Sequence, residues 1–377
     1  MTVFGFLSTY PPTRCGLATF TAALASAMSR PGDGDARVVR VDDLVPTGPA
    51  LPGPRTVVVG DLHPGEAAGR AAAAASISAC DVAVVQHEYG IYGGRDGDEV
   101  LDVLARLTAP SIVVLHTVRD APTPHQRWLL ERVAGLASAV VVMTDAAREI
   151  LSRRYSVPMS KVHVIPHGVP SWRMAPATTP RARPMILSWG LLGPGKGIEW
   201  GIRALAESPG IEPRPRYVIA GQTHPKVLLD SGEAYRESLL ELARTLGVAE
   251  DVEIDGRYRD ADELAELVAE ADAVLLPYDS REQTTSGVLV EAVAAGKPVI
   301  ATRFPHAVEL LAGGAGILVD HESPSGIAVA LATILGRQNA IGRGGLVPVE
   351  APVNDWESVA AQYRILGSGL LAKAHAA

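Results

Sequence analysis

Short runs of apolar, often β-branched residues alternate along the chain with longer amphipathic segments. A buried parallel strand is a short apolar run, whereas a helix that covers a sheet places its apolar residues three or four positions apart. Strands that alternate with helices in this way indicate an α/β fold built on parallel sheets. The pattern predicts strands at residues 3–8, 37–42, 56–60, 82–86, 112–116, 139–144, 162–165, 185–189, 216–220, 252–255, 273–276, 298–302 and 316–319. It predicts helices at residues 16–29, 97–107, 126–136, 145–154, 197–206, 233–246, 261–270, 287–295, 306–312 and 325–335.

The alternation starts afresh halfway along the chain. In each half, an opening strand runs into a loop rich in glycine and proline and then into a helix. We therefore expect two doubly wound, Rossmann-like domains that face each other across a cleft, with ligands bound at the carboxyl ends of the strands. The expected divisions are an N-terminal domain (1–170), a linker (171–184), a C-terminal domain (185–350) and a C-terminal helix that returns toward the N-terminal domain (351–377).

Composition narrows the class of protein and the kinds of partner. A length of 377 residues suffices for two cores, and 47% hydrophobic with 20% charged residues is typical of a folded globular enzyme. The 34 Lys and Arg against 42 Asp and Glu give a net charge of −8, so we expect no nucleic-acid partner and only local capture of anions. The longest uncharged run, between Arg14 and Arg30, is too short and polar to cross a bilayer, so we expect no integral membrane segment.

The start of the chain and its metal-binding residue types bear on compartment and cofactors. A strand-like run follows Met1 almost at once, without the basic segment and cleavage site of a signal peptide, so we expect a cytoplasmic protein. The sequence has two cysteines, Cys15 and Cys80, and no H-E-x-x-H pattern or cluster of His and Asp. We therefore predict no metal site.

Residues 283–291 (Gln-Thr-Thr-Ser-Gly-Val-Leu-Val-Glu) follow an apolar strand and start a helix. Thr285 or Ser286 can cap this helix, and Gly296 can end it. Free N–H groups at a helix start hold phosphate well, and Glu291, about one turn further along, can accept hydrogen bonds from a ribose diol. The alternative is an ordinary capped helix with a solvated glutamate.

Residues 193–197 (Gly-Pro-Gly-Lys-Gly) form a second candidate anion site. Glycines allow the backbone to approach a ligand closely, and Lys196 adds a full positive charge at a helix start. The spacing is not that of a P-loop, and no G-x-G-x-x-G fingerprint follows the first strand, which disfavours an NAD dehydrogenase. The alternative is a turn with a surface lysine.

Residues 86–94 (Gln-His-Glu-Tyr-Gly-Ile-Tyr-Gly-Gly) end a strand with polar and aromatic groups. Aromatic rings stack on the apolar faces of sugars, and polar side chains bind the hydroxyls, so this segment suits a sugar ligand. His116 ends the neighbouring apolar strand and points to the same edge of the sheet. It is a candidate catalytic or orienting group, with a structural histidine as the alternative.

These segments together resemble the GT-B glycosyltransferases of the retaining family 4 type, over nearly the whole chain. The resemblance rests on residues 10–16, His116, residues 165–169, residues 190–197, and the helix of Glu291 with the following residues 295–299. It implies that the N-terminal domain binds a carbohydrate or small-molecule hydroxyl acceptor. It also implies that the C-terminal domain binds a nucleotide-sugar donor. It also implies a reaction that needs no cofactor and no metal.

The resemblance assigns roles to individual residues. Lys196 would neutralise the donor diphosphate, and the N–H groups of Ser286 and Gly287 would bind it. Glu291 would hold the ribose, and His116 would lie beside the transferred sugar. The implied catalytic residues are His116 and Lys196, the remaining donor-binding residues are Gly16, Gly190, Gln283 and Thr285, and the acceptor-binding residues are Arg14, His87, Glu88, Tyr89 and Tyr92.

Two positions depart from the family pattern. Leu191 stands where the family usually has an arginine that binds the diphosphate, and Gln283 stands where it usually has the first glutamate of an E-x7-E pair. We expect Arg14 or Arg281 to replace the missing cation. The departures also leave a non-catalytic nucleotide-sugar sensor as an alternative.

The implied reaction is transfer of a hexose to a hydroxyl acceptor with retention of the anomeric configuration. No well-placed nucleophile is evident, so we expect front-face attack in which the departing phosphate oxygen takes the acceptor proton. A narrower subgroup is suggested by residues 86–94, 221–225, 232–236 and 283–287, and resemblance to it favours GDP-mannose over UDP-glucose. A sugar-nucleotide 2-epimerase shares this architecture, but it needs acid and base groups on both faces of the sugar, and the sequence shows no clear pair.

Overall fold

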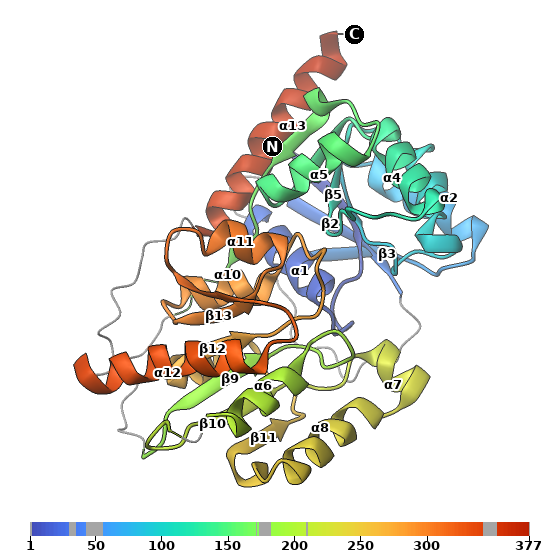
Figure 1. The fold of residues 1–377 in the computed structure, drawn as a ribbon. Helices are drawn as coiled ribbons and strands as arrows, with labels where there is room; N and C mark the ends of the chain where they lie inside the picture. The colour runs from blue at the N-terminus through green and yellow to red at the C-terminus, as the bar shows by residue number, and fades with distance from the viewer. Residues whose placement is uncertain are drawn as a thin grey trace. The chain divides into compact units, whose positions relative to one another are not determined.

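The computed structural model describes residues 2–29, 35–42, 56–170, 172, 182–208, 210–341 and 353–376. The chain divides into two compact units (Figure 1). Unit 1 comprises Met1–Gly168, Glu282–Thr285 and Asn354–Ala377, and unit 2 comprises Val169–Arg281 and Ser286–Val353. Most of the expected linker, residues 173–181, lies outside the described residues.

Unit 1 is built on a seven-stranded parallel sheet with the order β3-β2-β1-β4-β5-β6-β7. The order reverses between β1 and β4, and ligands of doubly wound sheets bind at such a reversal. The strands are β1 (Val3–Ser8), β2 (Asp35–Val41), β3 (Val57–Leu62), β4 (Val82–His87), β5 (Ser111–Leu115), β6 (Ala139–Val142) and β7 (Val162–Val164). The helices are α1 (Gly16–Met28), α2 (Ala67–Ser78), α3 (Val100–Leu104), α4 (Pro124–Leu136), α5 (Asp145–Arg154) and α13 (Trp356–Ala376), with 3₁₀ turns at Arg95–Gly97 and Met159–Lys161.

Unit 2 repeats this plan in a six-stranded parallel sheet with the order β11-β10-β9-β12-β13-β14, which reverses between β9 and β12. Its strands are β9 (Met185–Trp189), β10 (Arg216–Ala220), β11 (Val252–Asp255), β12 (Ala273–Leu276), β13 (Val299–Thr302) and β14 (Gly316–Val319). Its helices are α6 (Ile198–Ala206), α7 (Pro225–Ser231), α8 (Ala234–Thr245), α9 (Ala261–Glu270), α10 (Gly287–Ala294), α11 (Pro305–Leu310) and α12 (Pro324–Ile341), with a 3₁₀ turn at Ala249–Asp251. The strands β8 (Gly168–Val169) and β15 (Asn354–Asp355) form a separate two-stranded sheet.

Each large sheet carries an apolar core on both faces. In β1, Leu7 packs into one core of unit 1, whereas Phe4 and Phe6 pack into the other. Burial on both faces explains why the strands are continuous apolar runs and why every strand predicted from the pattern is present. The predicted pair of doubly wound α/β domains is therefore confirmed.

The pattern missed two helices. α2 consists mainly of alanine, so it lacks the large apolar residues whose spacing would mark one face. α7 is seven residues long and buries none of its residues, and its only strong signals are the His224 cap and Pro225 at its first position. Within the described residues, no helix combines the length and apolar character that a membrane crossing requires.

The C-terminal helix α13 belongs to unit 1 and completes one of its cores with Val359, Ala360 and Tyr363. Two glycines in this helix differ in their surroundings. A Cβ atom at Gly367 would lie 2.9 Å from the Phe4 ring, whereas a Cβ atom at Gly369 would meet nothing within 4 Å. Close packing against β1 therefore requires a glycine at position 367 and not at position 369.

Alanine substitutions at these two glycines are expected to change stability in opposite directions. Gly369→Ala should stabilise the protein by up to about 1 kcal/mol, because alanine favours the helix. Gly367→Ala should destabilise it by roughly 1–2 kcal/mol, because the methyl group forces the buried Phe4 ring to shift. Urea unfolding measures both changes, and equal effects of the two variants would contradict the docking of α13 on this core.

Candidate active site

The loop after β9 approaches β10 closely in unit 2. Gly190 has a φ of +116°, and its N–H donates to the Ala220 oxygen at 3.0 Å. A Cβ atom at Gly221 would collide with the Gly190 carbonyl oxygen, so the two backbones can meet only because residue 221 is a glycine. This packing fixes the start of the glycine-rich loop at the reversal of the sheet.

The glycine-rich loop is also tied to the end of β12. The N–H of Asp279 donates to the Gly195 oxygen at 3.0 Å, and the Trp200 indole donates to Asp279 Oδ1 at 2.7 Å. A Cβ atom at Gly197, where φ is +62°, would collide with the Pro277 oxygen. The loop therefore lies at the carboxyl edge of the sheet, between the two strands at which the order reverses.

Lys196 stands in this loop with an ammonium group that binds no carboxylate of the described residues. Its Nζ lies 4.7 Å from the centre of the Tyr278 ring, so the ring face holds the charge by a cation–π contact. The side chain is partly exposed. A positioned cation that lacks a carboxylate partner is suited to bind an anionic ligand.

Helix α10 begins as predicted at Gly287 and ends at Ala294, and Gly296, two residues later, adopts a φ of +65°. Ser286 is the N-cap, and its Oγ accepts from the Leu289 N–H at 3.2 Å. The first turn reaches the glycine-rich loop, because a Cβ atom at Gly190 would lie 3.8 Å from the Val288 side chain. The described residues show no hydrogen bond from the Gly287 or Val288 N–H, so both remain as donors for a ligand.

The Ser286 N–H, expected to bind the diphosphate, has a partner within the protein. This group donates to His306 Nδ1 at 2.8 Å, and both residues are buried. His306 lies at the start of α11 and holds the turn before α10 in place. The N–H of Ser286 is therefore engaged within the protein, and donor contact of Ser286 and Gly287 stays a prediction.

Glu291 lies one turn into α10, where the Trp189 indole donates to its Oε2 at 3.3 Å. Burial raises the pKa of Glu291 to about 7, and the indole N–H opposes this rise by stabilising the carboxylate. The carboxyl group therefore changes charge near neutral pH. Ribose hydroxyls would supply further donors to its ionised form.

The expected donor residues are divided between the two compact units. Gly190, Lys196, Ser286, Gly287 and Glu291 belong to unit 2, whereas Gly16, Gln283 and Thr285 belong to unit 1. Gly16 is the first residue of α1, and the Gln283 amide donates to the Thr285 oxygen at 3.0 Å. Of the two cations proposed to replace the missing arginine, Arg281 lies 3.9 Å from Glu322, and Arg14 lies in the loop before α1.

In unit 1, the paired strands β4 and β5 bring Gln86, His87 and His116 together at their carboxyl ends. The His116 N–H donates to the His87 oxygen at 3.1 Å, and His116 Nε2 lies 2.6 Å from Gln86 Oε1. The Phe20 ring packs edge-on against His116, with 4.8 Å between ring centres. Loss of hydration lowers the pKa of His116 to about 3, and His167 and His87 contribute to this shift. The imidazole is therefore neutral at physiological pH.

The expected acceptor residues on β4 and in the loop after it are mostly buried. His87 is 1% exposed, both its ring nitrogens lack a partner among the described residues, and burial lowers its pKa to about 4. Tyr89 and Tyr92 also lie mainly in the core, and Tyr92 Oη donates to the Gln86 oxygen at 2.7 Å. Glu88 accepts from Thr117 Oγ1 at 2.6 Å. Contact of these four residues and Arg14 with an acceptor stays a prediction.

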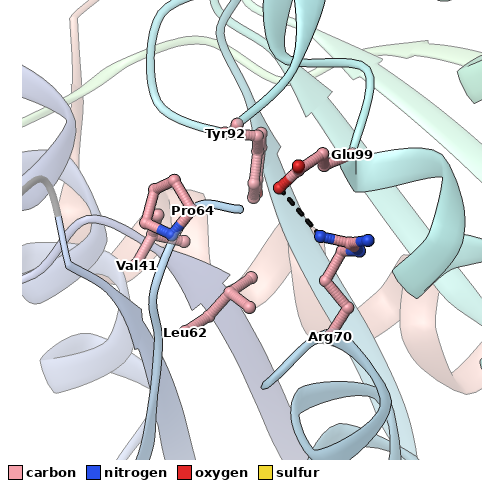
Figure 2. Close-up of a pocket in the computed structure, with 7 residues that line it drawn as sticks. Val41, Leu62, Pro64, Arg70, Tyr92 and Glu99 are labelled. Carbon is pink, nitrogen blue, oxygen red and sulfur yellow. Dashed lines mark ion pairs between the residues drawn. The ribbon is translucent and has the colours of Figure 1, made fainter. Parts of the chain in front are cut away.

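A small cavity lies behind this loop (Figure 2). Its wall includes Tyr92 and an ion pair in which Arg70 lies 3.0 Å from Glu99. Its volume of about 10 Å³ corresponds to a single water molecule, so it is not a substrate pocket. Glu99 also accepts from the Gly65 N–H at 2.8 Å, which connects the ion pair to the segment between β3 and α2.

Two family models match consecutive parts of the chain. The model described as "Glycosyltransferase Family 4" matches residues 16–173, and the model described as "Glycosyl transferases group 1" matches residues 183–337. The matches reach into both repeated units. The chain belongs to the GT-B glycosyltransferases of family 4. The resemblance found in the sequence is therefore confirmed.

Two curated relatives are each less than 30% identical to this chain. A D-inositol 3-phosphate glycosyltransferase of Geodermatophilus obscurus is 28% identical over 63% of this chain and 57% of its own length. An α-D-kanosaminyltransferase of Streptomyces kanamyceticus is 26% identical over 52% of this chain and 53% of its own length. The chain thus spans little more than half the length of these relatives. The solved HepE protein of Anabaena, in complex with UDP and glucose, has a TM-score of 0.66, 16% identity and full coverage of both chains, which shows the shared fold.

The sequence pattern did not indicate three side chains that support the candidate site: Trp189, Tyr278 and His306. Trp189 and Tyr278 follow from a simple signal, since each lies at or just after the carboxyl end of a strand next to the sheet reversal. His306 carries no such signal, because its contact with Ser286 depends on how two loops pack.

Proposed function

We propose that this chain transfers a hexose from a nucleoside diphosphate sugar to a hydroxyl acceptor with retention of the anomeric configuration. One observation carries the proposal: the Lys196 ammonium binds no carboxylate of the described residues and lies in a loop that meets the start of α10. The N–H groups of Gly287 and Val288 are available at the same start. A cation beside free helix-start donors is suited to a diphosphate.

The same groups suit the chemistry of glycosyl transfer. When the anomeric C–O bond breaks, negative charge collects on the β-phosphate and positive charge on the sugar. Fixed N–H groups and an ammonium stabilise the departing diphosphate without a metal ion. In front-face attack, the acceptor hydroxyl bonds to the anomeric carbon and its proton passes to the departing phosphate oxygen. We assign no general base, and the neutral His116 adds no positive charge beside the sugar.

The donor proposal follows from the resemblance and from the site. GDP-mannose is our first candidate from the subgroup resemblance, and UDP-hexoses are the second, since HepE of similar fold was solved with UDP and glucose. GDP-mannose and UDP-hexoses both contain a ribose, which Glu291 would hold in either case. The acceptor class is a carbohydrate or a small hydroxyl compound.

A donor panel tests the proposal. Purified protein is incubated with GDP-mannose, UDP-glucose and ADP-glucose, without added acceptor and with simple glycosides, and the released nucleoside diphosphate is measured. Transfer or slow donor hydrolysis is expected with one base, and EDTA should leave the rate unchanged. Conversion of a donor to its 2-epimer would support the epimerase instead, and tight binding without turnover would support a sensor.

A further inference from the structure

The hydrogen bond between Gln86 and His116 connects a fully buried glutamine to a residue beside the proposed sugar site. His116 Nε2 lies 2.6 Å from Gln86 Oε1, and Gln86 is 0% exposed. Gln86 Nε2 has no hydrogen-bond partner among the described residues. Within that part of the chain, the Gln86 side chain therefore hydrogen-bonds through Oε1, to His116. A buried amide whose hydrogen bond goes to a histidine of the site is suited to orient the ring of that histidine.

The backbone on both sides of this hydrogen bond is paired within the sheet. Gln86 pairs with Val114 in the register of β4 and β5, and His116 follows directly with its N–H on the His87 oxygen. Tyr92 Oη donates to the Gln86 oxygen at 2.7 Å, which fixes the strand end from the other side. The two side chains therefore meet by the geometry of the sheet.

The effect of the Gln86 hydrogen bond depends on whether the His116 ring is neutral or protonated. The titratable groups that act on the ring are His167, which follows β7, and His87 at the end of β4, while α1 contributes the Phe20 ring. Burial and both histidines keep His116 neutral, so the ring carries one N–H. If Nε2 carries the proton and donates to Gln86 Oε1, Nδ1 is left as an acceptor.

A glutamine at this position has a different effect from a carboxylate. A glutamate would stabilise the imidazolium and place a positive charge where the sugar itself becomes positive. The amide orients the ring equally well and adds no charge. The residue type at position 86 therefore fits a neutral histidine beside a developing oxocarbenium ion.

We propose that Gln86 is a positioning residue that orients the His116 ring and fixes its proton on Nε2, so that Nδ1 accepts a hydrogen bond from a hydroxyl of the transferred sugar. The sugar contact rests on the proposed function. The position of the proton does not, because it is a property of the protein without ligand.

The first test is nitrogen-15 NMR of the ligand-free protein with labelled histidine. The His116 signals are identified by their loss in His116→Ala. We expect the Nε2-protonated tautomer in the wild type and a mixture of both tautomers in Gln86→Leu. Protonation on Nδ1 in the wild type, or an unchanged tautomer in Gln86→Leu, would overturn the proposal. This readout needs no turnover, so it separates a wrong positioning role from a wrong proposed function.

The second test uses Gln86→Glu, which keeps the size of the side chain and remains informative if Gln86→Leu folds poorly. The carboxylate should raise the pKa of His116 toward neutrality, because it stabilises the imidazolium. The kcat of this variant should then fall below the new pKa and recover at higher pH, whereas the kcat of the wild type shows no such limb near neutral pH. Gln86→Leu should lower kcat/KM about tenfold at all pH values. A Gln86→Glu profile that superimposes on the wild type would contradict the positioning role.

Discussion

Replacing Lys196 with alanine is expected to lower kcat about 100- to 1000-fold. The ammonium lies in the loop beside the start of α10, where the proposed function places the departing diphosphate. Removal of one preorganised group that stabilises transition-state charge has an effect of this size. KM for the donor should rise less than kcat falls, because the charge on the β-phosphate grows only as the bond breaks.

Two variants control the Lys196 experiment. Lys196→Arg keeps the charge and should retain part of the activity, whereas Lys373→Ala removes an exposed lysine near the end of α13 and should have no effect. Steady-state rates of nucleoside diphosphate release compare the three variants. Similar losses in Lys196→Ala and Lys373→Ala would exclude a specific role for Lys196.

Replacing Glu291 with glutamine is expected to raise KM for the donor about 10- to 100-fold, since hydrogen bonds to an ionised group contribute roughly 1.5–3 kcal/mol. The pKa of about 7 predicts the direction of the pH dependence. In the wild type, KM should fall as the pH rises through 7, because the ionised carboxylate accepts from the ribose diol better than the neutral acid. Glu291→Gln should remove this dependence.

Trp189→Phe tests whether the Glu291 carboxyl group causes the pH dependence of KM. It keeps an aromatic ring in the core and removes the indole N–H that donates to Glu291 Oε2. Without this donor the pKa of Glu291 should rise, so the inflection in KM should move to a higher pH. An inflection that stays in place in Trp189→Phe, or persists in Glu291→Gln, would show that another group titrates.

Stability should also depend on the charge of Glu291, with a defined sign. The folded pKa of about 7 is above the ordinary value of 4.5, so the folded state binds this proton more tightly than the unfolded state and is favoured by it below pH 4.5. Its stabilising contribution is lost as the pH rises from 4.5 to 7, by up to about 3 kcal/mol. In urea unfolding, the wild type should therefore lose this free energy of unfolding between pH 4 and pH 8, whereas Glu291→Gln should not.

The elements of this fold are readable from the sequence because most of its strands are buried on both faces. A run such as Val82–His87 is apolar until its last two residues, and the polar residues begin where the strand reaches the carboxyl edge. Helices with large apolar residues on one face were equally clear. α2 was not predicted because its alanines cover the sheet without forming a distinct apolar face. α7 was not predicted because it buries none of its residues.

The candidate site was readable where backbone geometry determines it. The N-cap at Ser286, the end of the helix before Gly296 and the glycine-rich loop follow from residue type and spacing. The partners of these groups depend on the packing of segments far apart in the sequence. The contact of His306 with Ser286 and that of Trp189 with Glu291 span 20 and 102 residues, so local patterns could not reveal them.

The most direct test of the account is proton NMR of the anomeric signals during incubation with GDP-mannose or UDP-glucose and a simple glycoside acceptor. We predict that one donor is consumed, that nucleoside diphosphate appears, and that the first product has the anomeric configuration of the donor. Lys196→Ala should abolish this signal on the same time scale. An inverted product would contradict retention, and an epimerised or unconsumed donor would contradict glycosyl transfer.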